Sequence, residues 1–277
     1  MIPKAFIDQW RAMAPWVADH QVEQDLIISR ALVELYSDPF LRERLAFRGG
    51  TALYKLHLSA ARYSEDIDLV QTRPEPIGDT LNALRARLDP WLGSPKREFS
   101  DGRVTLSYRL MSEGEPSVRL KLKVEINSRE HFAVFGLQKY PFRVQSRWFT
   151  GEAEVTGYTL DEQLGTKLRA LYQRRKGRDL FDLWDALTRS EADPDRIVVA
   201  FLAYMKAEGH AVHRAEFEEN LAHKLADTRF TSDVRLLLRA GVAWDVQEAA
   251  VLVGRALVAR LPGEAWRGFL GADRAAT

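Results

Sequence analysis

The 277-residue chain contains no cysteine, which excludes disulfide bonds and thiolate chemistry and suits a reducing compartment. It has no uncharged run of membrane-spanning length, and its first residues, MIPKAFIDQWRAMAPW, lack the apolar core of a signal peptide. A net charge of +1 gives no overall attraction to nucleic acid or membrane, so any basic surface must be local. We therefore expect a cytoplasmic protein that does not associate with membranes.

The chain is long for one domain, and its patterns change character near residue 155. Helical periodicity and strand alternation mix before that point, whereas the remainder is helix-rich. We therefore predict an α+β fold with two parts, residues 1–155 and 156–277. The patterns predict helices at 4–20, 22–36 and 77–92 and strands at 45–48, 63–70, 104–111 and 118–127, with short extra strands within 128–157.

An Asp-x-Asp motif lies on the expected strand 63–70. Asp66 and Asp68 are two residues apart and point to the same face, while Ile67 and Leu69 point to the core. Two adjacent carboxylates repel each other, and a divalent cation such as Mg²⁺ or Mn²⁺ relieves that repulsion while also binding phosphate oxygens. On its own the motif is more often a solvated strand.

A glycine turn, Gly49-Gly50-Thr51, follows the expected strand 45–48. We expect Thr51 to be the N-cap of a helix that runs to about residue 59. Glycines permit close backbone approach, and the free N–H groups of a helix start bind anions. A plain strand-to-helix turn is the simpler explanation, and the Gly-Lys-Ser/Thr of a Walker loop is missing. The combination with Asp-x-Asp favours a phosphate and metal site.

A third acidic residue, Glu125, lies on the polar face of strand 118–127, where apolar and polar residues alternate. If this strand lies beside the Asp-x-Asp strand, Glu125 completes a three-carboxylate cluster of the kind that two-metal nucleotidyl transfer needs. The alternative is an ion pair between Glu125 and a neighbouring basic side chain.

A basic segment, KLRALYQRRKGRDLFD, begins at Lys167. Six of the twelve residues at 167–178 are basic and none is acidic, and Lys167 and Arg174 share a helical face. Such a face can bind a polyphosphate or a nucleic-acid backbone, although most charge runs are simply solvated. Asp179 and Asp182 fix the basic residues, contact substrate or stabilise the start of the next helix.

Three stretches together resemble the AbiEii/AbiGii-type nucleotidyltransferase family, whose members are toxins of abortive-infection, type IV-like toxin–antitoxin systems. They are FRGGTALYKLHLSAARYSEDIDLV, LKVEIN and KLRALYQRRKGRDLFDL. The resemblance implies a DNA polymerase β-like nucleotidyltransferase core followed by an all-α region. It also implies an NTP substrate, Mg²⁺ or Mn²⁺, an antitoxin partner with a winged-helix DNA-binding part, and, for some members, transfer to the 3′ end of tRNA that blocks translation and growth.

The resemblance carries functional roles to matching residues. It implies nucleotide binding by Gly49, Gly50, Thr51, Ser64, Lys167 and Arg174, metal binding by Asp66, Asp68 and Glu125, and catalysis by Asp66, Asp68, Lys167, Asp179 and Asp182. Thr51 stands where the broader polymerase β signature has serine, and the motif does not distinguish Asp179 from Asp182. We expect a monomeric toxin that transfers a nucleotide to tRNA. The alternatives are transfer to a protein side chain or an antibiotic, and a non-catalytic nucleotide- or RNA-binding module.

Overall fold

The alternating residues that predict strand 118–127 form an inner strand of a mixed β-sheet in the computed structural model, which describes residues 2–113 and 116–268. The chain divides into two units, Met1–Thr159 and Leu160–Thr277. In the described part of the first unit, the strands form one seven-stranded sheet of order β3-β4-β5-β2-β1-β7-β6. The strands are β1 (Leu45–Arg48), β2 (Asp66–Gln71), β3 (Lys96–Ser100), β4 (Arg103–Met111), β5 (Arg119–Asn127), β6 (Leu137–Gln145) and β7 (Thr150–Tyr158).

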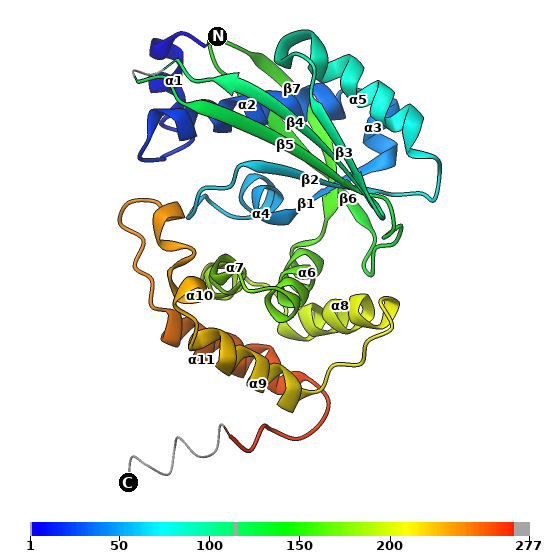
Figure 1. Cartoon of the computed structure of the whole chain (residues 1–277), viewed down its shortest axis with the longest axis vertical. Helices are drawn as coiled ribbons and strands as arrows, with labels where there is room; N and C mark the ends of the chain where they lie inside the picture. Colours follow the sequence, from blue (N-terminus) through cyan, green and yellow to red (C-terminus); the bar gives the residue numbers. More distant parts are fainter. Residues whose placement is uncertain (1, 114–115, 269–277) are drawn as a thin grey trace. The chain divides into compact units, whose positions relative to one another are not determined.

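Helices cover one face of this sheet (Figure 1). They include α2 (Asp19–Tyr36), α3 (Pro39–Arg44) and α5 (Ile77–Leu92), with α1 (Lys4–Trp10) packed against α2. Alternation decides which strand residues meet them: Leu122, Val124 and Ile126 of β5 are buried, as are Ile67 and Leu69 of β2. The polar residues between them point to the opposite face.

The opposite face carries the short helix α4 (Gly49–Ala52), which continues as one turn of π-helix, Leu53–His57. Strand β2 lies between two neighbours of different direction, antiparallel to β1 and parallel to β5. Strand β1 is also parallel to β7, with Phe47 opposite Gly157. The centre of the sheet therefore joins segments that are far apart in the sequence.

The second unit is built from helices in its described residues. Its core forms where the leucine stripe of α6 packs against α7 and α8, and the close approach of α6 to α8 requires Gly165, because a Cβ there would lie 2.5 Å from that of Ala200. The elements are α6 (Leu160–Gln173), α7 (Gly177–Arg189), α8 (Pro194–Ala207), α9 (Arg214–Leu225), α10 (Thr228–Ser232) and α11 (Val246–Ala256), with 3₁₀ turns at Arg235–Leu237 and Val258–Arg260.

Three of the expected elements differ from those observed. The first helix ends at Trp10, and it could not have continued to residue 20 because Pro15 has no N–H to donate and restricts the residue before it. Thr51 is not an N-cap: helix α4 already begins at Gly49, and Thr51 is buried within its first turn. The expected short strands within 128–157 are two strands of nine residues each, β6 and β7.

Candidate active site

Acidic side chains of β2 and β5 share the polar face of the sheet. In the parallel pairing of these strands, Asp68 lies opposite Glu125 and Asp66 lies opposite Lys123. Residues that face each other across a pair of strands point to the same side, so Asp66, Asp68 and Glu125 belong to one surface. The two strands are therefore adjacent, which meets the condition that the sequence analysis set for Glu125.

The carboxylate of Glu125 is held by basic neighbours. Lys123 forms an ion pair with it, and the guanidinium of Arg103 lies 3.8 Å from its second oxygen. Among residues 2–113 and 116–268, no group of three or more carboxylate or imidazole side chains is arranged to hold a metal ion. Asp66 and Asp68 nevertheless fit Mg²⁺ by their chemistry, because that ion is commonly bound through one or two carboxylates plus substrate phosphates. The role of Glu125 as a third ligand stays a prediction.

The glycine turn lies directly against the Asp-x-Asp strand. Gly49 has a φ of +86°, which L side chains rarely adopt, and a Cβ on it would lie 2.1 Å from Oδ2 of Asp68. A Cβ on Gly50 would lie 2.5 Å from a terminal nitrogen of Arg62 and 3.0 Å from Oγ of Ser64. A side chain at Gly50 would displace only the ends of the Arg62 and Ser64 side chains, whereas the absence of one at Gly49 lets the Asp68 carboxylate rest on the backbone.

Hydroxyl groups fasten this turn to β2. The Thr51 hydroxyl lies 2.5 Å from the carbonyl oxygen of Asp66 and 2.9 Å from Oγ of Ser64. Because a carbonyl only accepts, Thr51 donates to it, and its side chain is buried. Thr51 and Ser64 thus fix the position of Asp66 relative to the glycine turn.

Arg48, which the sequence analysis did not identify, is a charged neighbour of Asp68. It lies opposite Asp68 in the β1–β2 pairing and forms an ion pair with Glu130 at 2.5 Å. Burial acts to lower the pKa of Arg48, but the neighbouring groups Glu130, Tyr158 and Asp68 outweigh it and raise that pKa. Its place immediately before the glycine pair was the available signal.

Helix α2 fastens the same region from the other side. The amide of Gln24 donates to the carbonyls of Glu65 and Lys121, at 3.3 and 3.0 Å, and so ties the start of β2 to β5. The buried carboxylate of Asp25 accepts from Nζ of Lys55 at 2.7 Å, which anchors the π-helical turn that follows Thr51. Two indole N–H groups, from Trp10 and Trp16, donate to the same carboxylate. No sequence pattern pointed to these supports.

In the second unit, the basic segment meets two buried carboxylates on α7. Nζ of Lys167 lies 2.7 Å from Asp182 and 3.5 Å from Asp179, and both aspartates are fully buried. Arg174 donates two hydrogen bonds to Asp179, at 2.6 and 2.7 Å, while half of its side chain is exposed. Asp179 and Asp182 therefore hold Lys167 and Arg174, and Lys167 is buried instead of solvated.

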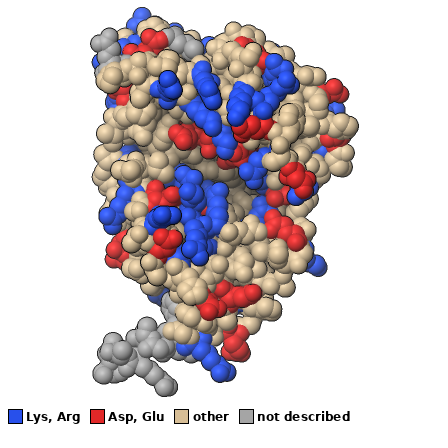
Figure 2. Space-filling view, viewed as in Figure 1, with Lys and Arg blue, Asp and Glu red and all other residues tan. Residues whose placement is uncertain are grey.

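The other basic residues of that segment also have acidic partners in the second unit. Arg169 pairs with Glu208 at 2.9 Å, and Arg175 lies 3.8 Å from Asp227. Lys and Arg side chains remain prominent on the surface of the helical unit (Figure 2). The segment is thus a charged surface with compensating acids, and Arg174 is its exposed member beside the buried aspartates.

The family profile described as "Nucleotidyl transferase AbiEii toxin, Type IV TA system" matches residues 30–251, which include every candidate residue of both units. This chain belongs to that AbiEii family. Family membership makes it a nucleotidyltransferase-type toxin of a toxin–antitoxin system, and an antitoxin partner follows from that. No curated protein sequence matches the chain.

Solved structures share the fold of this AbiEii member. MenT4, a nucleotidyltransferase toxin from Mycobacterium tuberculosis H37Rv, is 17% identical with a TM-score of 0.66, over 95% of this chain and 91% of MenT4. JHP933 from Helicobacter pylori is 16% identical with a TM-score of 0.55, over 87% of this chain and 91% of JHP933. The predicted α+β nucleotidyltransferase fold with a helical second part is confirmed.

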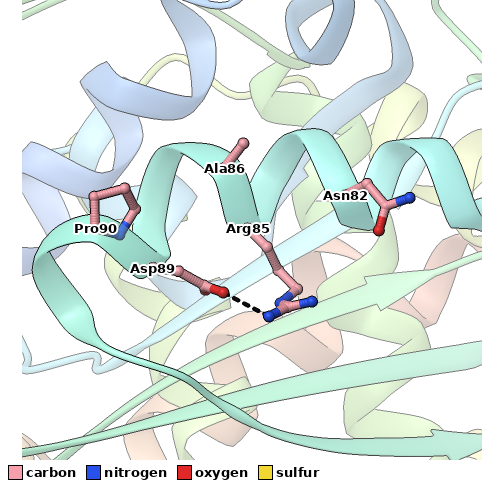
Figure 3. A pocket seen from close by; sticks show the side chains of 5 residues that line it. All are labelled: Asn82, Arg85, Ala86, Asp89 and Pro90. Carbon is pink, nitrogen blue, oxygen red and sulfur yellow. Dashed lines mark ion pairs between the residues drawn. The ribbon is translucent and has the colours of Figure 1, made fainter.

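Helix α5 of this AbiEii member carries an open hollow that does not include Asp66, Asp68 or Glu125 (Figure 3). It is lined by Asn82, Arg85, Ala86, Asp89 and Pro90. Arg85 pairs with Asp89 at 2.8 Å, and the Tyr108 hydroxyl donates to the same carboxylate at 2.9 Å, so the charges are already neutralised. Tyr108 is on the helix-covered face, opposite to Asp66 and Asp68.

Within the described residues, no helix has the length and apolar character needed to cross a membrane.

Proposed function

We propose that this AbiEii member transfers a nucleotide from an NTP to the 3′ end of tRNA and so blocks translation and bacterial growth. The observation that carries the proposal is the contact between the glycine turn and Asp68, beside Asp66, on one face of β2. Backbone N–H groups for phosphate and two carboxylates for Mg²⁺ or Mn²⁺ are thereby brought together. When bound, the metal ion neutralises phosphate charge and polarises the reacting phosphorus.

In the proposed reaction, the terminal hydroxyl of tRNA attacks the α-phosphorus, and the bond from that phosphorus to the bridging oxygen of the β-phosphate breaks. Pyrophosphate leaves, and the hydroxyl proton passes to solvent. Asp66 and Asp68 hold the metal, and the backbone at Gly49 and Gly50 binds phosphate oxygens. Thr51 and Ser64 keep this turn in place through their hydroxyl contacts. Arg48 orients the carboxylate opposite it in the register.

Lys167 and Arg174 of the second unit are proposed to bind the NTP phosphates and to stabilise the leaving pyrophosphate. Their support is the buried pair Asp179 and Asp182, whose carboxylates contact both side chains and fix their positions. In this proposal the two aspartates act through the basic residues rather than on the substrate. Asp182 makes the shorter ion pair with Lys167, whereas Asp179 accepts both hydrogen bonds from Arg174 and also lies 3.5 Å from Nζ of Lys167.

Transfer of a labelled NTP to total tRNA tests the enzyme. Asp66→Asn and Asp68→Asn remove one metal ligand each, and we expect each to lower the transfer rate more than about a hundredfold, because metal-ion catalysis is worth several kcal/mol. Asp79→Asn, the same exchange at an exposed position of α5, is the matched control and keeps the rate. Unchanged transfer in Asp68→Asn would reject the assignment. Label that survives RNase treatment of the product would place the acceptor among proteins or small molecules.

The biological part of the proposal concerns the cell. We propose a monomer that acts in the cytoplasm, where tRNA is found, and that is neutralised by an antitoxin with a winged-helix DNA-binding part. Expression without the antitoxin should stop bacterial growth, and Asp68→Asn should restore it. Normal growth at confirmed expression of the unaltered chain would contradict the toxin assignment, and toxicity that survives Asp68→Asn would favour a non-catalytic binding module.

A further inference from the structure

We propose that the polar face of β3, β4 and β5 binds the phosphate backbone of the acceptor RNA and leads it toward Asp66. This inference rests on the proposed function, because it assigns a surface to the acceptor of that reaction. The basic strand face, as we name it, consists of Lys96, Arg109, Arg119, Lys121 and Lys123, together with Met111. Lys and Arg side chains gather over these strands in the upper part of Figure 2.

Register places these residues on the same surface as the carboxylates. Lys123 lies opposite Asp66 on one side and Ser107 on the other, and Ser107 in turn lies opposite Lys96. These four residues form one row across the sheet. The next rows, moving away from Asp68, are Arg109 with Lys121 and then Met111 with Arg119. The basic rows therefore begin at the row that contains Asp66.

In the described part of the chain, the repulsion between Arg109 and Lys121 is not offset by an acidic partner of either residue. Like charges directly opposite each other on neighbouring strands are destabilising. Within residues 2–113 and 116–268, no acidic side chain forms an ion pair with Arg109, Arg119 or Lys121, and all three are exposed. A bound polyanion would relieve this repulsion. The arrangement thus sacrifices some stability in a way that a ligand would recover.

The positive field is also visible at Glu98, the acidic residue of β3 on this face. The hydrogen bond and charge of Lys96, joined by the charges of Lys121 and Lys123, lower the pKa of the Glu98 carboxyl. Glu98 pairs with Lys96 at 2.6 Å, just as Glu125 pairs with Lys123. Within the basic strand face, the ion-pair partners of Glu98 and Glu125 are therefore Lys96 and Lys123. The basic residues of the more distant rows form no ion pair with either acid.

The spacing favours a nucleic-acid backbone over the NTP itself. Arg119, Lys121 and Lys123 alternate along β5, so successive charges are about 6.6 Å apart. Arg119 is about 20 Å along the strand from Glu125, too far for the phosphates of a nucleotide held at Asp66 and Asp68. Lys and Arg that neutralise successive phosphates supply sequence-independent affinity. Met111, 54% exposed, adds an apolar contact for a sugar or base.

The test compares two double variants of the full chain. Arg109→Ala with Lys121→Ala removes the middle row, and Lys139→Ala with Arg143→Ala removes the same two residue types from exposed positions on β6 at the other edge of the sheet. Binding of fluorescent total tRNA is measured by anisotropy between about 50 and 200 mM salt. We expect the first variant to bind at least about tenfold more weakly and its slope of log K against log salt to fall by about 2. The β6 variant should bind like the unaltered chain.

Three further readings decide the matter. The KM for tRNA should rise in the Arg109/Lys121 variant while the KM for NTP stays constant, and its melting temperature should not fall, since repulsion has been removed. Equal tRNA binding by the two double variants overturns the inference. The inference is also overturned if the Arg109/Lys121 variant binds the antitoxin more weakly but binds tRNA normally, because the face would then be a protein-binding surface. If the unaltered chain transfers nucleotide to no RNA, the proposed function fails. The binding comparison measures RNA affinity and not transfer, so the two failures can be told apart.

Discussion

Replacing Gly49 by alanine tests the contact on which the candidate site depends. The methyl group would lie 2.1 Å from Oδ2 of Asp68, and rotating the carboxylate away would not relieve the overlap, because Cβ of Asp68 would still lie 3.0 Å away. The φ of +86° costs an L residue about 1–2 kcal/mol, and forcing β2 away from the turn costs about 1–3 kcal/mol more. We therefore expect a loss of about 2–5 kcal/mol in the free energy of unfolding, together with loss of nucleotide transfer.

Gly136→Ala separates the two causes. Gly136 also has a positive φ, +75°, but a Cβ there meets nothing within 4 Å. This control should lose only the conformational cost of about 1–2 kcal/mol and should keep its transfer rate. Urea denaturation gives the stabilities, and labelled-NTP transfer to tRNA gives the rates. Gly49→Ala with the stability of Gly136→Ala and a normal rate would refute the view that this glycine exists to admit Asp68.

Two further predictions concern buried charges. Lys167→Met leaves Asp182 buried without its cation and should cost about 3–5 kcal/mol of unfolding free energy, and adding Asp182→Asn should recover part of that loss in a double-mutant cycle; strictly additive losses would contradict the pairing. Burial raises the pKa of Glu23 from 4.5 to about 7, so the folded chain keeps a proton that the unfolded chain loses. The stability that this proton gives is complete below pH 4.5 and is lost as the pH rises to about 7, by about 3 kcal/mol in all. Glu23→Gln should flatten that pH dependence in urea titrations, and an unchanged slope would disprove the assignment to Glu23.

Residue patterns predicted those features that depend on a single element, namely its type and the face to which each side chain points. The alternation of residues 118–127 and the spacing of Asp66 and Asp68 were enough to assign strands and faces, because side-chain direction in a strand follows from parity alone. Parity cannot choose a neighbour, so the pairing of Asp68 with Glu125 was conditional on the two strands being adjacent. The strands β6 and β7 gave a weak signal because most side chains of β6 and the first half of β7 are exposed or half-buried, which leaves little apolar alternation.

Contacts between different elements could not be predicted from the sequence. Helical spacing placed Lys167 on a polar face, but two carboxylates from α7 make its burial possible. The hydroxyl of Thr51 was expected to cap a helix, and it donates to the carbonyl of Asp66 instead because helix α4 already begins at Gly49. Gln24 and Asp25 are ordinary polar residues of α2 until β2, β5 and the π-helical turn are packed around them.

The order of strands also governs when a newly made chain acquires the candidate catalytic face. Asp68 lies opposite Glu125 of β5, and β1, which leads into the glycine turn, pairs with β7, where Phe47 faces Gly157. Such long-range pairings form late, because the intervening loop must close before any contact repays it. A ribosome must therefore release the chain through Tyr158 before the turn and the aspartates can be locked together. Fragments that end before Tyr158 should accordingly lack the assembled candidate site.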